Sequence, residues 1–111
     1  MKAAILPGLL LLAFGCTSTP AGHNHQVAMQ DYRFAPDSLE VAVGDTVTWV
    51  NEGAYQHSST SGEVGAPDGK WDSGLLSTGA SFAHVFTVAG NYHYYCTLHG
   101  SMGMKGVISA R

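Results

Sequence analysis

The chain has 111 residues and a formal net charge of −3, and only 12% of its residues are charged. This length allows one small domain, and an acidic chain without a Lys/Arg cluster is a poor nucleic-acid binder. The sequence also contains neither a GxxxxGK[ST] nor a GxGxxG loop, which excludes the common glycine-rich nucleotide sites.

The N-terminal segment is typical of an export signal. A basic start at Met1–Lys2 precedes an apolar run from Ala3 to Phe14, followed by the small Gly15. The run is too short and too interrupted to span a bilayer, so residues 1–15 are predicted to be a signal peptide. The protein is therefore expected outside the cytoplasm, in the periplasm or at the cell surface.

Cys16 follows the predicted signal directly. The segment Leu12–Cys16 resembles a bacterial lipobox, although Ala13 stands where leucine is usual. We favour lipidation of Cys16, because an exported free thiol invites oxidation. Ordinary cleavage after the small-x-small pattern that ends at Gly15 is the alternative. Membrane contact is expected only through this anchor.

Residues 16–26 are polar and rich in turn formers, which predicts a flexible tether with His23 and His25 in solvent. From Val27 onward, apolar residues alternate with polar or small residues in short segments, which predicts strands. The clearest segments are 39–43, 46–51, 82–88 and 92–96. The Gly/Ser/Asp-rich stretch 58–79 is expected to be a loop with Trp71 as an apolar anchor.

Roughly six to eight short strands with glycine-centred turns predict an all-β domain over residues 27–111. The expected architecture is a two-sheet antiparallel Greek-key β-sandwich. Gly90–Tyr92 also resembles a tyrosine corner, in which a tyrosine hydroxyl fastens a crossover between strands.

The segment Tyr94–Val107 contains several side chains that could bind a metal. It places one thiol, one imidazole and two thioethers on a loop between two predicted strands. Cys96 and His99 can face a common point across the loop mouth, and His57, which follows another strand, can complete the set. Two imidazole nitrogens and a thiolate with a weak axial thioether form a type 1 (blue) copper site.

This segment resembles the copper loop of small cupredoxins of the plastocyanin and pseudoazurin type. The similarity rests on Cys-x-x-His-(x)4-Met and extends through the runs 32–51 and 72–82, covering nearly all of residues 27–110. The resemblance implies a cupredoxin fold and one copper ion that alternates between Cu(I) and Cu(II). The ligands that it implies are His57, Cys96, His99 and Met104.

Three positions qualify the resemblance. Met102 is six residues after Cys96, the spacing of the shorter amicyanin-type loop, whereas the context Gly103–Val107 favours Met104 as the axial ligand. Ser58 and Leu98 stand where the family usually has asparagine and proline. Both departures are expected to alter the surroundings of the thiolate without removing a ligand.

The predicted function is one-electron transfer outside the cytoplasm by a monomer that is not an enzyme. His99 on an exposed loop and Tyr95, expected to face outward beside Cys96, form the predicted electron-transfer surface. The expected partners are redox proteins such as a c-type cytochrome, an oxidase or a reductase.

Two other functions compete with electron transfer. Copper capture or delivery at the cell surface is the alternative, since His23, His25 and Met102 offer spare donors. An enzyme with Cys96 as nucleophile and His57 as base is disfavoured. The sequence shows no evident partner carboxylate or oxyanion motif for such a reaction.

Overall fold

The computed structural model describes residues 22–111, so the predicted signal peptide, the lipidation at Cys16 and the first part of the tether lie outside the described residues. No helix in residues 22–111 has the length and apolar character needed to cross a membrane. The described chain forms nine strands and one short 3-10 helix: β1 (Asn24–Gln30), β2 (Arg33–Ala35), β3 (Ser38–Val41), β4 (Thr46–Asn51), β5 (Thr60–Glu63), β6 (Ala66–Asp72), β7 (Ser81–Val85), β8 (Gly90–Tyr95), η1 (Gly100–Met102) and β9 (Lys105–Ala110).

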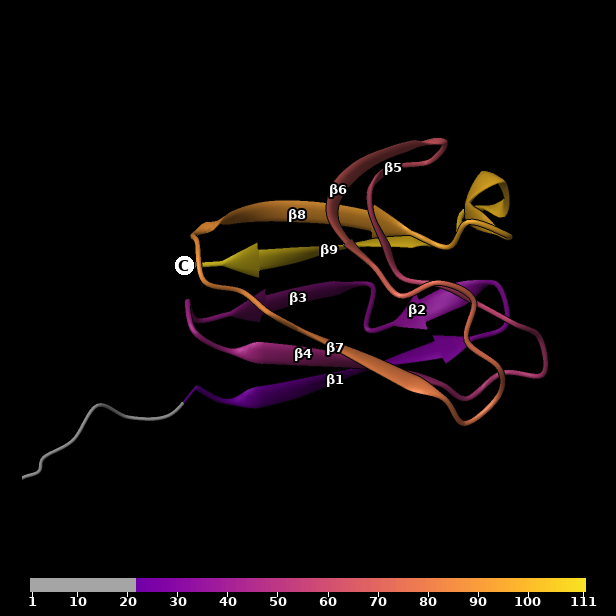
Figure 1. Ribbon diagram of the computed structural model, residues 1–111, viewed down its shortest axis with the longest axis horizontal. Helices are drawn as coiled ribbons and strands as arrows, with labels where there is room; N and C mark the ends of the chain where they lie inside the picture. Colours follow the sequence, from indigo (N-terminus) through magenta and orange to yellow (C-terminus); the bar gives the residue numbers. More distant parts are fainter. Residues whose placement is uncertain (1–21) are drawn as a thin grey trace, which may run out of the picture.

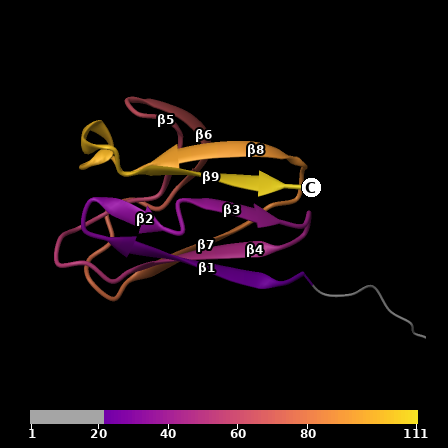
Figure 2. The same ribbon diagram turned by 180° about the vertical axis from the view of Figure 1, so that it is seen from behind.

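The strands form two sheets that face each other, with the orders β2-β1-β4-β7 and β3-β9-β8-β5-β6 (Figures 1 and 2). The predicted sandwich is confirmed, but its sheets are mixed. β1 pairs with β4 in parallel, and β3 pairs with β9 in parallel. A parallel pair needs a crossover, and the chain supplies one by passing through β3 in the opposite sheet between β1 and β4. The expectation of purely antiparallel sheets is therefore wrong.

The core lies between the two sheets. Alternate residues of β4 are buried, so that Val47 and Trp49 face inward as their spacing predicts. The Trp49 and Trp71 rings pack with their centroids 5.5 Å apart, which joins the two layers. The tyrosine corner is also present, because the Tyr92 hydroxyl donates a hydrogen bond to the Val88 carbonyl oxygen.

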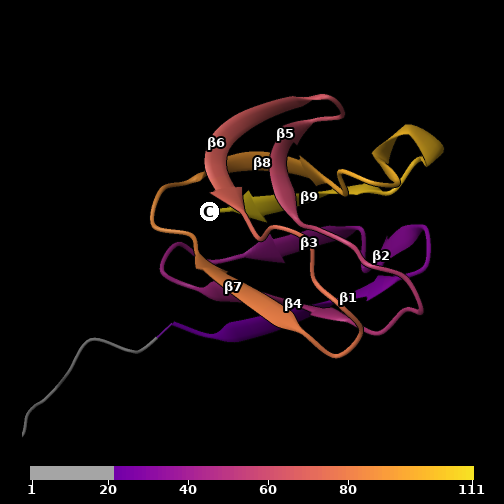
Figure 3. The same ribbon diagram turned by 45° about the vertical axis from the view of Figure 1, so that its right-hand side comes forward.

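The stretch 58–79 is not the simple loop that its composition predicts. It contains β5 and β6, which form a strongly curved hairpin (Figure 3). In β6 only Trp71 is buried. The Ser61 hydroxyl fixes this residue by accepting its N–H and donating to its carbonyl oxygen, at 2.9 and 3.1 Å.

The first strand begins earlier than predicted, since β1 starts at Asn24 inside the segment expected to be a tether. The Asp45 carboxylate holds this end of the chain. It accepts the backbone N–H of His23 at 2.8 Å, and its other oxygen lies 2.8 Å from the His25 ring nitrogen Nε2. His25 is therefore fixed against the sandwich, and its predicted place in a solvated linker is wrong.

Replacing Asp45 with asparagine is expected to lower the melting temperature of the metal-free protein by several degrees at pH 7. The bonds from the His25 ring and from the His23 and Ala42 N–H groups lower the pKa of Asp45 from 3.8 to about 2. A lowered folded-state pKa adds stability above about pH 4, and this stability is lost as the pH falls through about 2.

The difference in melting temperature between wild type and Asp45→Asn should therefore shrink from pH 4 to pH 2. Glu40→Gln is the control, because the Glu40 side chain is 68% exposed in its ion pair with Arg111. A difference that stays constant over this pH range would contradict the assignment to Asp45.

Candidate metal centre

Three side chains from two distant parts of the chain converge at one end of the sandwich. The ligand atoms of His57, Cys96 and His99 all lie within 4.8 Å of one another. The two Nδ1 atoms are 3.1 Å apart, and the Cys96 Sγ lies 3.8 Å from the Nδ1 of His57 and 3.6 Å from that of His99. The structure thus brings together three of the four residues that the sequence predicts as ligands.

Backbone hydrogen bonds position each of these residues. His57 forms an isolated bridge with Leu76, in which each N–H donates to the other residue's carbonyl oxygen at 3.1 and 2.8 Å. Cys96 directly follows β8, and its N–H donates to the Met104 carbonyl oxygen at 3.0 Å. The Gly100 N–H donates to the Cys96 carbonyl oxygen at 2.7 Å, which closes the loop around the thiol.

The donor set fits copper. His57 and Cys96 are fully buried, whereas His99 is half-buried. One thiol and two imidazole nitrogens that share so small a space are three donors aimed at a single point. A soft thiolate suits Cu(I) and imidazole suits Cu(II), so this set can hold either oxidation state.

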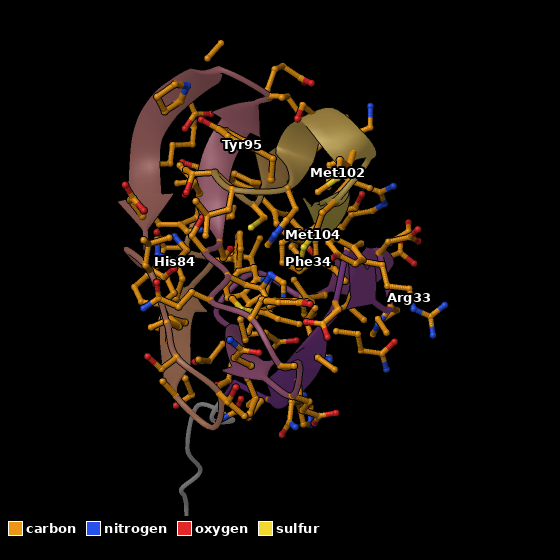
Figure 4. All side chains as sticks on the ribbon, turned by 90° about the vertical axis from the view of Figure 1, so that its right-hand side faces the viewer. Arg33, Phe34, His84, Tyr95, Met102 and Met104 are labelled. Atoms are coloured by element: carbon orange, nitrogen blue, oxygen red, sulfur yellow. The ribbon has the colours of Figure 1, made fainter. Side chains whose placement is uncertain are left out.

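The two loop methionines differ in their surroundings. Met104 is fully buried, and its N–H donates to the His99 carbonyl oxygen at 3.2 Å. Met102 is 60% exposed on η1. Figure 4 looks onto this end of the molecule and shows Met104 nearer its middle than Met102. The structure therefore places Met104 against the backbone of two predicted ligands and leaves Met102 in solvent.

Asp31 is a residue of this site that sequence reasoning missed. It lies in the turn between β1 and β2, and its Oδ1 is 3.0 Å from the Nε2 of His57. The same carboxylate accepts the N–H of Ala54, at 3.0 Å, and that of Tyr55. The Ala54 N–H and the His57 ring lower the pKa of Asp31 below its ordinary value of 3.8, so both contacts favour the ionised carboxylate. A single Asp in a turn carries no motif that could reveal this contact.

Aromatic and apolar side chains surround the half-buried His99. The Tyr32 and His99 rings are nearly perpendicular with centroids 5.1 Å apart, and Tyr55 packs beside both. These two tyrosines are about half exposed, as is Leu98 on the copper loop. His99 therefore reaches the surface within a rim of uncharged groups.

Tyr95 does not face outward as predicted, because it is only 5% exposed. The turn of η1 and Val64 of the β5–β6 hairpin cover it. A Cβ added at Gly100 would lie 3.1 Å from the Tyr95 ring and 3.3 Å from Val64. Strand alternation sets the direction of a side chain, but this loop and hairpin remove its access to solvent. The expectation that Tyr95 belongs to the exposed electron-transfer surface is wrong.

Ser58 ties the two ligand-bearing loops together. Its buried hydroxyl accepts the N–H of Thr97, next to Cys96, at 2.9 Å. The same hydroxyl lies 3.0 Å from the Thr60 hydroxyl. Ser58 therefore links the His57 segment directly to the Cys96 loop.

Replacing Ser58 with alanine is expected to lower the free energy of unfolding of the metal-free protein by about 1–3 kcal/mol, because the Thr97 N–H loses its acceptor. Urea unfolding measures this loss. Ser101→Ala on the exposed turn of η1 is the control and should change the value by less than about 0.5 kcal/mol. Equal losses in the two variants would contradict the proposed link.

The sandwich and its Cys/His/His centre define a copper protein of cupredoxin architecture, and comparison with known proteins agrees. Residues 21–111 match the family described as copper binding proteins, plastocyanin/azurin family. Plastocyanin of Scenedesmus fuscus is 34% identical over 84 residues, which are 70% of this chain and 86% of that protein. Amicyanin of Paracoccus denitrificans is 35% identical over 78 residues, covering 68% of this chain and 58% of that protein.

Solved structures give the same result. A novel purple cupredoxin from Nitrosopumilus maritimus superposes with a TM-score of 0.72 at 32% identity, covering 78% of this chain and 99% of the other. A reduced amicyanin variant gives a TM-score of 0.68 at 28% identity, covering 78% and 81% of the two chains. The chain belongs to the plastocyanin/azurin family of copper binding proteins. It is a small blue copper protein that carries electrons.

Proposed function

We propose that one copper ion is held by His57, Cys96 and His99, with the buried Met104 as the axial ligand. The observation that carries this proposal is the convergence of two Nδ1 atoms and one Sγ at the end of a rigid sandwich. The bound ion supplies one-electron redox chemistry there. Because the two sheets and the bridge to Leu76 hold the ligands, little rearrangement accompanies the change of valence.

Electrons enter and leave through the His99 edge in this proposal. His57 and Cys96 are fully buried and Tyr95 is covered, whereas His99 reaches the surface. The side chains of Tyr32, Tyr55 and Leu98 are uncharged, so a redox partner can pack against them without desolvating a charge on these three groups. A c-type cytochrome, an oxidase or a reductase of the exporting cell fits this kind of surface.

Replacing Leu98 with glutamate is expected to slow electron self-exchange between copies of the protein by about tenfold or more, because two like charges would meet at the contact face. NMR line broadening in mixtures of the reduced and oxidised protein measures the rate. Val85→Glu is the matched control, since Val85 is 48% exposed on β7. Equal slowing in both variants would contradict transfer through the His99 face.

The proposed location is outside the cytoplasm, with the protein anchored by lipid at Cys16. The apolar run before Cys16 supports this proposal. Mass spectrometry of the mature N-terminus separates a diacylated Cys16 from ordinary signal cleavage.

Electron transfer is favoured over copper delivery and over enzymatic activity. A delivery site must release its ion, but three of the four proposed ligands are fully buried. His25, a spare donor in the delivery hypothesis, is engaged by Asp45. The Cys96 thiol is fully buried, which disfavours it as a nucleophile. Incubation with a metal-free acceptor protein tests delivery, and the carrier should retain its copper.

A further inference from the structure

The turn between β1 and β2 places a carboxylate behind one of the proposed copper ligands. Asp31 Oδ1 lies 3.0 Å from the Nε2 of His57, on the side of the ring opposite the Nδ1 that faces Cys96. An ionised carboxylate only accepts hydrogen bonds, so Nε2 must carry the ring hydrogen. The Nδ1 of His57 is then left with a free lone pair, which is the state that binds a metal.

The surrounding backbone is built to hold this carboxylate. The N–H groups of Ala54 and Tyr55 both donate to Asp31, so the anion is bonded to the segment that leads into His57. Gly53 leaves the necessary space: a Cβ at this position would clash with Asp31 Oδ1 and would lie 3.0 Å from His57 Nε2. Any residue larger than glycine would displace the contact.

We propose that Asp31 is a positioning residue of the copper centre. Its carboxylate fixes the ring orientation and tautomer of His57, and its charge favours Cu(II) over Cu(I). This inference rests on the proposed ligation by His57. A carboxylate bonded to the far nitrogen of a ligating imidazole makes that ligand more basic. The Asp31 side chain is 31% exposed, so its charge is only partly screened by water.

The first test is the reduction potential of the copper-loaded protein. Asp31→Asn keeps an acceptor oxygen and removes the charge, so the preference for Cu(II) should fall about tenfold. For a one-electron couple this is a rise of about 59 mV. Gly53→Ala should shift the potential in the same direction by displacing the carboxylate. Glu40→Gln makes the same change of charge beside the C-terminal Arg111, and should leave the potential unchanged because the C-terminus lies at the other end of the sandwich from the copper loop (Figure 1).

The second test is the His57 tautomer in the metal-free protein, read from the ring nitrogen shifts by NMR. Wild type and Asp31→Asn should show hydrogen on Nε2, and Asp31→Ala should show a mixture of tautomers. Unchanged potentials in both Asp31→Asn and Gly53→Ala, or an unchanged tautomer in Asp31→Ala, would overturn the proposal. If the wild type binds no copper, the proposed function fails, whereas the tautomer measurement still decides the role of Asp31.

Discussion

Replacing Cys96 with serine is expected to abolish the intense visible absorption of the copper-loaded protein completely. The absorption arises when a thiolate transfers charge to Cu(II), and a serine hydroxyl is not deprotonated by this site at neutral pH. The copper affinity should also fall by more than about tenfold, since a ligand is lost. Visible spectroscopy and copper titration measure both effects.

The fold should survive this change, because serine has nearly the volume of cysteine and the sandwich core is built from residues of both sheets. Far-ultraviolet circular dichroism of Cys96→Ser is therefore the control and should match that of the wild type. A Cys96→Ser protein that remains intensely coloured would remove Cys96 from the ligand set.

Replacing Met104 with glutamine is expected to lower the reduction potential by about 59 mV or more, a tenfold change in the preference for Cu(II). The harder amide oxygen would replace a thioether in the axial position, so the visible spectrum should change as well. Voltammetry and absorption spectroscopy at fixed pH measure the two effects.

Met102→Gln is the matched control for the axial position. The Met102 side chain is 60% exposed, so its replacement should alter the potential little. If Met102→Gln gives the large shift and Met104→Gln gives none, the axial ligand is Met102 and the loop follows the shorter spacing.

Much of the fold is encoded in short-range alternation. Val47 and Trp49 on β4 and Tyr94 on β8 show the period of two that a half-buried strand requires, and the structure buries all three. The hairpin of β5 and β6 carries no such signal. Its buried β5 residues are Thr, Ser and Gly, and β6 buries only Trp71. Hydrogen bonds rather than apolar alternation hold this region.

In the site too, some features can be read from local spacing in the sequence and others arise only from the fold. Cys96 and His99 lie three residues apart in one loop, so their common role is visible in the sequence. The contact of Asp31 with His57 joins residues 26 positions apart through a single hydrogen bond, which leaves no local pattern. The burial of Tyr95 depends on the path of η1 and of Val64 over it. Sequence spacing therefore indicates which residues can bind copper, and the packing of loops decides which groups support or cover them.

Copper titration of the purified mature protein tests the central claim most directly. One equivalent of Cu(II) should produce the intense visible absorption of a copper–thiolate bond. A one-electron reductant should bleach this absorption, and a one-electron oxidant should restore it in full over repeated cycles. Protein that binds copper without this absorption, or that loses the ion on reduction, would contradict the assignment as an electron carrier.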